Sequence, residues 1–306
     1  MKHFHANLNL TSVIIIIAVG VLLPVMLSTA AGIVALVMAK DAGGIVTGVL
    51  VISFTATAAG SALVAVVLAG KKARLAQRQA DFVANVSHEF RTPLSAIRLY
   101  AQTLQSGKLS VDPERTAQCL STIVRETEWL DFMMDCVLTW RASSRDMLPL
   151  NMETKPVSQT ISNAIERFRA MVVSDELALS TVIDSQLPVR HDVRALNTIV
   201  LNLLTNAYKY TGKKKRIEIN VHDENQYVVI SVSDNGIGLT PRETKRVFQQ
   251  FYRVNNEDSR NAGGVGLGLA IVRDLVNRHK GAISVVSDKG KGTTFRITLP
   301  TTLDNA

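Results

Sequence analysis

The sequence predicts three successive parts: two transmembrane helices, an α-helical hairpin that forms a four-helix bundle with a second copy, and a C-terminal α/β domain. Two long runs without charged residues near the start predict the membrane part. An apolar repeat of seven residues after them predicts the hairpin. Helix-like and strand-like segments alternate over the second half, which predicts the α/β domain. The chain, at 306 residues and 47% hydrophobic, is long enough to hold all three.

The membrane part is predicted from residues 11–39 and 42–70, which contain no charged side chain. Each run exceeds the ~20 residues that cross a bilayer core. Lys71 and Lys72 follow the second run without a nearby acid, so this end, and therefore the N-terminus, is predicted to be cytoplasmic. A cleavable signal peptide ending near Ala30 is the weaker alternative, because the apolar run is too long for one. The predicted boundaries are a cytoplasmic N-terminus at 1–10, spans at 11–39 and 45–70, and an extracytoplasmic turn at 40–44.

The net charge of +8 does not point to nucleic acid, because no DNA- or RNA-binding motif accompanies it. Part of the excess flanks the predicted membrane span, where it suits anionic lipid. Cys119 and Cys136 show no metal-ligand spacing and lie on one predicted cytoplasmic helix. We therefore expect two reduced structural thiols.

The helical hairpin is predicted over residues 71–142, with a break at 106–113. Its first helix repeats an apolar residue every seven positions, as do two registers of its second helix. The repeats are Val83, Phe90, Ile97 and Leu104, then Ile123, Leu130 and Val137, and Leu120, Thr127 and Met134. A lone hairpin with such a seam leaves one side uncovered, so we expect a homodimer.

Within the first helix, the stretch NVSHEFRTPLSAIRLY at 85–100 places His88 away from the apolar seam. At about 100° per residue, the imidazole projects roughly 160° from the seam and should reach solvent. Glu89 is adjacent and could accept a proton or orient the ring. Thr92 lies one turn further on. Taken alone, these residues also fit an exposed helix with no chemical role.

This stretch resembles the phosphoacceptor box of bacterial two-component sensor histidine kinases, in their HisKA-type dimerisation domain. The resemblance implies that His88 receives the γ-phosphoryl group of ATP and passes it to an aspartate of a response regulator. It also implies that Thr92, in the pattern HExxT, positions water for dephosphorylating the regulator.

After a predicted linker at 143–156, residues 157–306 carry four motifs in the order found in the ATP-binding domain of the same family. That domain has the α/β sandwich of the Bergerat or GHKL fold, shared with Hsp90, gyrase and MutL. The first motif, NTIVLNLLTNAYKY at 197–210, resembles the N box, and its polar residues share one helical face. The resemblance implies that Asn206 binds Mg²⁺, Asn202 supports the site, Lys209 faces phosphate and Tyr210 packs near the nucleotide.

The other three motifs are DNGIGL at 234–239, VFQQFYR at 247–253 and GGVGLGLAIV at 263–272. By resemblance, Asp234 accepts a hydrogen bond from the adenine amino group, and Phe248 and Phe251 are packing anchors. Glycines before a helix present backbone N–H groups to phosphate. Val265 replaces a hydroxyl residue common in the family, and the polar segment 254–262 is expected to be a lid. The remaining expected ATP contacts are Gly236, Gly238, Gly264, Gly266, Leu267 and Gly268.

The resemblance therefore implies a membrane-bound histidine kinase that uses ATP and Mg²⁺ and pairs with a response regulator. Two alternatives stay open at this point: a membrane-tethered ATPase of the same fold, and a regulatory scaffold or phosphatase without kinase activity. The predicted turn at 40–44 is too short to fold, so the stimulus would be read in the bilayer, through a membrane partner protein, or from the cytoplasm.

Overall fold

The computed structural model of this chain describes residues 23–107, 112–144, 149–172, 177–254 and 266–302. The chain divides into two compact units, Met1–Ala80 and Asp81–Ala306.

In the first unit, helix α2 (Leu23–Val37) precedes the start of the long helix α3 (Ala42–Gln105). Residues Ala42–Ala73 form the one described helix that is long and apolar enough to cross a membrane, and Pro24–Val37 is a shorter apolar helix. The second predicted span therefore has a structural counterpart, whereas the first lies partly outside the described residues. Two crossings remain a prediction.

The turn between these helices is tight. Asp41 Oδ1 accepts a hydrogen bond from the backbone N–H of Gly44 at 3.1 Å, which satisfies a donor at the start of α3. Gly48 faces α2 so closely that a Cβ atom there would lie 3.1 Å from the carbonyl oxygen of Gly32. Small residues thus let the two backbones approach.

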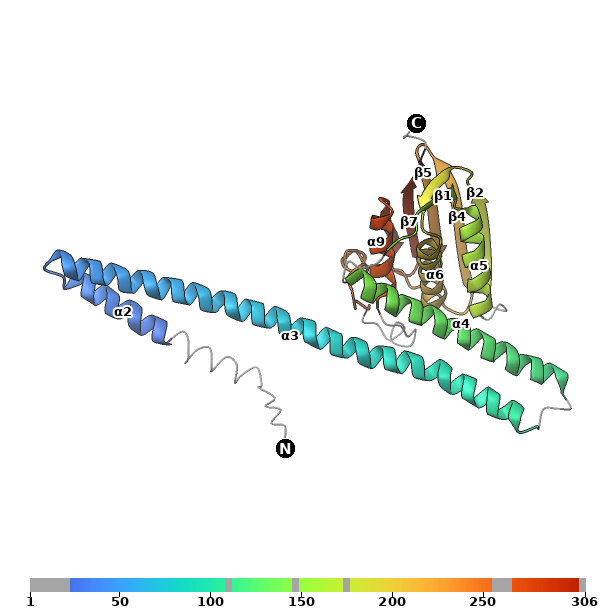
Figure 1. The fold of residues 1–306 in the computed structure, drawn as a ribbon, viewed down its shortest axis with the longest axis horizontal. Helices are drawn as coiled ribbons and strands as arrows, with labels where there is room; N and C mark the ends of the chain where they lie inside the picture. The colour runs from blue at the N-terminus through green and yellow to red at the C-terminus, as the bar shows by residue number, and fades with distance from the viewer. Residues whose placement is uncertain (1–22, 108–111, 145–148, 173–176, 255–265, 303–306) are drawn as a thin grey trace. The chain divides into compact units, whose positions relative to one another are not determined.

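The second unit begins with the hairpin formed by the end of α3 and by helix α4 (Pro113–Ser144) (Figure 1). The two helices are separated at the predicted break. Asp112 Oδ1 accepts a hydrogen bond from Arg115 N at 3.0 Å, and Pro113 occupies the first helical position, where its missing N–H costs nothing. Phe82 of α3 meets Trp140 of α4 with ring centroids 4.7 Å apart, which fixes the antiparallel pairing.

The rest of the unit is a two-layer α/β domain (Figure 1). Its five-stranded sheet has the order β2-β4-β5-β7-β6, with β2 and β4 parallel and the other neighbours antiparallel. A separate antiparallel pair joins β1 to β3. The strands are β1 (Glu153–Pro156), β2 (Leu177–Asp184), β3 (Pro188–His191), β4 (Lys215–Glu224), β5 (Tyr227–Asp234), β6 (Ala282–Asp288) and β7 (Gly292–Pro300), and the helices are α5 (Ser158–Met171), α6 (Val193–Tyr210), α7 (Pro241–Thr244) and α9 (Gly268–Arg278).

Helices α5, α6 and α9 cover one face of the sheet (Figure 1). Strand β4 shows why, because Ile217, Ile219 and Val221 are fully buried while the residues between them are exposed or half-buried. Helix α6 starts at a cap where Asp192 Oδ1 accepts from Ala195 N at 2.9 Å. This cap and the buried face of α6 hold its polar face toward the start of α9.

Candidate functional site

His88 lies on the solvent-exposed side of α3, as the heptad pattern predicts. Thr92 is also exposed, and Glu89 is half-buried. The imidazole of His88 is therefore accessible to a second domain or a second protein.

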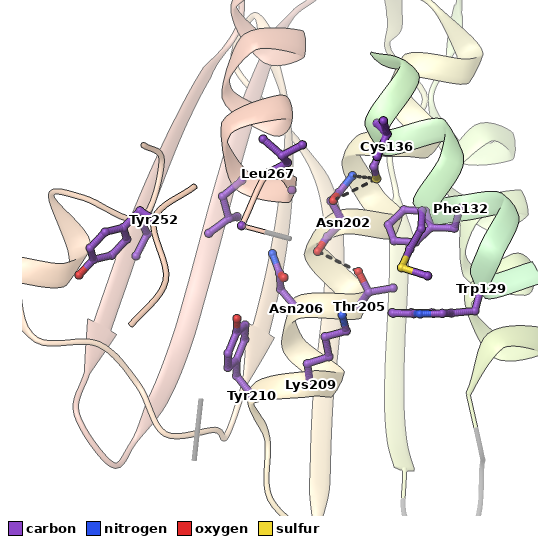
Figure 2. Close-up of a pocket in the computed structure, with 16 residues that line it drawn as sticks. Trp129, Phe132, Cys136, Asn202, Thr205, Asn206, Lys209, Tyr210, Tyr252 and Leu267 are labelled. Carbon is purple, nitrogen blue, oxygen red and sulfur yellow. Dashed lines mark hydrogen bonds between the residues drawn. The ribbon is translucent and has the colours of Figure 1, made fainter. Parts of the chain in front are cut away.

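The N-box residues of α6 line a cavity of about 110 Å³ (Figure 2). Asn206, Lys209 and Tyr210 are half-buried in its wall, and Asn202 is buried behind them. Asn202 Nδ2 donates to the carbonyl oxygen of Thr198 at 2.8 Å, which fixes the amide. The structure thus brings together the polar face that the sequence predicts.

The start of α9 packs directly on this amide. A Cβ atom at Gly268 would collide with Asn202 Oδ1, so only glycine lets α9 begin here. Leu267 is buried beside it, and Gly266 has φ 73° and accepts a hydrogen bond from Phe251 N at 2.9 Å. Gly264, Val265 and residues 255–262 of the predicted lid lie outside the described residues.

Asp234, at the end of β5, lines an adjoining cavity of about 80 Å³ with Ile237, Leu239, Thr293 and Phe295. Its Oδ1 accepts from Gly236 N at 2.8 Å, and burial raises the pKa of the carboxyl group although this hydrogen bond opposes the shift. Gly238 has φ 62° and sits against the backbone of Asp288, so the turn needs glycine there. A carboxylate is thus held at the wall of a mostly apolar cavity, which suits the recognition of a flat base with an amino group.

Two N-box residues have shifted pKa values. Burial lowers the pKa of Lys209, while the nearby negative charge of Glu89 raises it. Burial also raises the pKa of the Tyr210 hydroxyl, with Arg253 lowering it and Glu89 adding to the rise. The carboxylate next to His88 is therefore close enough for its field to act on two N-box residues.

Five residues of α4 also line the cavity, a role that the sequence motifs did not predict for them: Trp129, Phe132, Met133, Cys136 and Val137. Figure 2 shows Trp129, Phe132 and Cys136 facing α6. Cys136 Sγ lies 3.7 Å from Asn202 Oδ1, and burial raises the pKa of its thiol to about 12. Both cysteines are free, and Cys119 is buried while Cys136 is half-buried, which agrees with the expectation of reduced thiols. The i, i+3, i+4, i+7 spacing of Trp129, Phe132, Met133 and Cys136 was the available signal of a second apolar face on α4.

The aromatic anchors have different partners. Phe248 meets Phe295 edge-on at 6.2 Å, within the α/β domain. Phe251 contacts Phe82 and Trp140, with centroids 5.3 and 5.6 Å away. The motif at 247–253 therefore packs both on its own sheet and on the base of the hairpin.

Residues 191–303 match the family described as histidine kinase-, DNA gyrase B- and HSP90-like ATPase, and residues 78–141 match the His Kinase A (phospho-acceptor) domain. The chain is 34% identical to the sensor-like histidine kinase SenX3 of Mycobacterium tuberculosis over 233 residues, which is 76% of this chain and 56% of SenX3. The chain belongs to the two-component sensor histidine kinases. This histidine kinase is also 32% identical to the sensor protein RprX of Bacteroides fragilis, over 75% of its own length and 45% of RprX.

Among solved structures, the histidine kinase is similar to the mycobacterial sensor histidine kinase MprB, with 28% identity and a TM-score of 0.44. That match covers 49% of this chain and 98% of MprB. The chain spans about half the length of the curated relatives it matches. The family assignment means that the α/β domain binds ATP.

The cavity residues fit the Mg²⁺ that normally accompanies ATP. In the part of the chain that the structure describes, no group of three or more His, Cys, Asp or Glu side chains could form a metal cage. Mg²⁺ bound with a nucleotide needs only one or two protein oxygens besides phosphate and water. The side-chain oxygen of Asn206, in the wall shared by both cavities, could provide such a ligand.

Proposed function

We propose that this protein is a membrane-bound sensor histidine kinase that phosphorylates His88 with ATP, transfers the phosphoryl group to an aspartate of a response regulator, and also removes it from the regulator. One observation carries the proposal: the exposed His88 and the cavity of Asn206 and Lys209 belong to one compact unit, in which the charge of Glu89 acts on Lys209. The phosphoacceptor His88 and the nucleotide site thus belong to the same structural unit.

In the nucleotide site, Asp234 accepts from the adenine amino group and Lys209 neutralises phosphate charge. Asn206 would hold Mg²⁺, which shields the phosphate oxygens during transfer, and Asn202 fixes the start of α9. Tyr210 packs beside the base. Backbone groups at the two glycine-rich turns complete the ATP contacts: Gly236, Gly238, Gly264, Gly266, Leu267 and Gly268.

At His88, a neutral ring nitrogen attacks the γ-phosphorus, so that an N–P bond forms while the P–O bond to ADP breaks. Glu89 orients the ring and takes the proton released from the other nitrogen. When the protein dephosphorylates the regulator, the Thr92 hydroxyl positions the water that attacks the phosphoaspartate.

The proposal includes a homodimer. Apolar side chains of α4 remain more than half exposed in the single chain, which is a large unpaired surface for a helix. They are Leu120, Val124, Met134 and Leu138. A second copy would cover this stripe and form the four-helix bundle.

We also propose that both spans anchor the protein in the cell membrane, with the N-terminus and the catalytic domains in the cytoplasm. The helix Ala42–Ala73 supports one crossing, and the basic residues after it support the orientation. Deletion of residues 1–70 should abolish the response to stimulus in cells; an unchanged response would contradict a sensing role for them.

The full chain in detergent, incubated with Mg²⁺ and ATP labelled at the γ-phosphate, tests the proposal. We expect acid-labile, base-stable label on the protein and none on His88→Gln, which should still bind ATP. His222→Gln, a change at a partly exposed histidine of β4, is the matched control and should keep full labelling. Label on the His88→Gln protein would reject His88 as acceptor. ATP turnover without label would favour the ATPase alternative, and neither turnover nor label would favour the scaffold.

A further inference from the structure

Helix α4 closes the phosphate end of the nucleotide cavity. Trp129, Phe132, Met133, Cys136 and Val137 line it on the α4 side. Figure 2 shows Trp129, Phe132 and Cys136 across from Asn206. The cavity measures about 110 Å³, and the adjoining one with Asp234 about 80 Å³. Pockets for small molecules and cofactors usually measure about 300–1,000 Å³. Neither cavity alone reaches that range, and α4 lines the one that contains Lys209.

The same helix holds the cation that phosphate needs. Lys209 Nζ lies over the indole ring of Trp129, 4.5 Å from its centroid, and Figure 2 shows the two side chains meeting at the edge of the cavity. A buried ammonium group over an indole face is attracted by the ring, and most strongly by tryptophan. A phosphate group in the cavity would therefore compete with Trp129 for the Lys209 ammonium group.

An ion-pair cluster fastens α4 in this position. Arg167 of α5 pairs with three carboxylates spaced along one side of α4: Glu128 at 3.3 Å, Asp131 in a shorter contact, and Asp135 at 3.5 Å. The Arg167 side chain is 30% exposed, so the cluster is partly shielded from solvent. Several charges meeting on one guanidinium hold a helix better than an isolated surface pair. We call these four residues the Arg167 clamp.

We propose that α4 and the triphosphate of ATP compete for Lys209, and that Trp129 together with the Arg167 clamp sets the nucleotide affinity of this kinase. This inference rests on the proposed nucleotide site. In the arrangement seen here, the Lys209 ammonium group contacts the Trp129 ring instead of phosphate, and the clamp holds α4 against the cavity. ATP binds when α4 moves away from α6, so any influence that loosens α4 raises ATP affinity, and bound ATP loosens α4 in return.

The test measures the affinity of the full chain in detergent for a non-hydrolysable ATP analogue with Mg²⁺, and for adenosine, by calorimetry. Trp129→Leu keeps an apolar side chain but removes the ring, and we expect about 3- to 30-fold tighter binding of the ATP analogue. Adenosine affinity should change less than about twofold, because adenosine occupies the end with Asp234 and makes no phosphate contact. Trp129→Phe, with a weaker ring, should fall between the wild-type protein and Trp129→Leu.

Arg167→Gln opens the clamp without touching the cavity and should tighten binding of the ATP analogue, with little effect on adenosine. Arg169→Gln removes an equal charge from an exposed position of the same helix and should leave both affinities unchanged. Should Trp129→Leu fail to fold, Arg167→Gln still decides the outcome. Unchanged or weaker binding of the ATP analogue by Arg167→Gln and Trp129→Leu would overturn the competition while leaving the proposed function intact. If no form of the protein binds either ligand, the nucleotide site itself is wrong, and the inference falls with it.

Discussion

Replacing Asp234 with asparagine tests the adenine end of the site. The Asp234 carboxylate already accepts from Gly236 N at 2.8 Å and hydrogen-bonds the backbone of Thr293, and its two oxygens offer about four acceptor sites in all. A further bond from the adenine amino group would be charge-assisted and contribute about 1.5–3 kcal/mol. Asparagine has one acceptor oxygen, which Gly236 N occupies, so its NH₂ group would face the amino group of adenine. We expect ATP affinity to fall about 10- to 150-fold.

The assay compares the affinities of the full chain for ATP and inosine triphosphate, each with Mg²⁺, by equilibrium binding. Inosine has a carbonyl oxygen where adenine has its amino group, so Asp234→Asn should bind inosine triphosphate better than the wild-type protein does. Asp223→Asn is the control, because Asp223 also caps backbone and hydroxyl donors, from Ser185 at 2.6 Å and Gln186 at 3.0 Å, but does not line the cavity. It should lower thermal stability and leave both affinities unchanged. Equal losses for the two nucleotides in Asp234→Asn would refute the assignment of Asp234 to the amino group.

Three further predictions concern the stability of the core, the pH dependence of stability, and the dephosphorylation of the regulator. Phe168 is fully buried in the α/β domain, so Phe168→Ala should lower the unfolding free energy by about 3–5 kcal/mol, as measured by denaturant titration. A loss below about 1 kcal/mol would contradict its place in the core. Burial lowers the pKa of His191, whose Nδ1 donates to Val189 O and whose Nε2 accepts from Thr160. The unfolded chain therefore binds more protons than the folded chain, and the free energy of unfolding should fall as the pH drops below about 6.5. His191→Gln should show a shallower fall. Thr92→Ala should slow dephosphorylation of the regulator about 10- to 100-fold while autophosphorylation stays near normal, and equal losses in the two rates would argue against a water-positioning role.

Periodicity predicted the main elements well, because their burial follows the chain's own pattern. Strand β5 ends at Asp234 and α6 ends at Tyr210, in agreement with the motif positions. Strand β1 was missed and assigned to the linker, since its four residues are exposed or half-buried and show no alternation. Its pairing with β3 brings together segments more than thirty residues apart, which local pattern cannot reveal.

The site was predicted in its parts, and the wall contributed by α4 was not. Resemblance to the family motifs identified Asn206, on the polar face of α6, and Asp234, at the end of β5. Trp129 and Cys136 belong to another domain, and their contact with α6 depends on how the chain returns from the hairpin through the segment at 143–156. A heptad analysis assigns each helix a single seam and therefore leaves the second apolar face of α4 unexplained.

The two apolar faces of α4 have separate partners. At about 100° per residue, the face formed by Trp129, Phe132, Met133 and Cys136 is centred roughly 170° from the exposed stripe of Leu120, Val124, Met134 and Leu138. Closure of the nucleotide cavity by the first face therefore leaves the second face free for a second copy of the chain. Because the two contacts do not compete, release of α4 from Lys209 requires no dissociation of the proposed dimer. The two proposals together therefore predict that the site opens to ATP by a movement of the hairpin within an intact bundle.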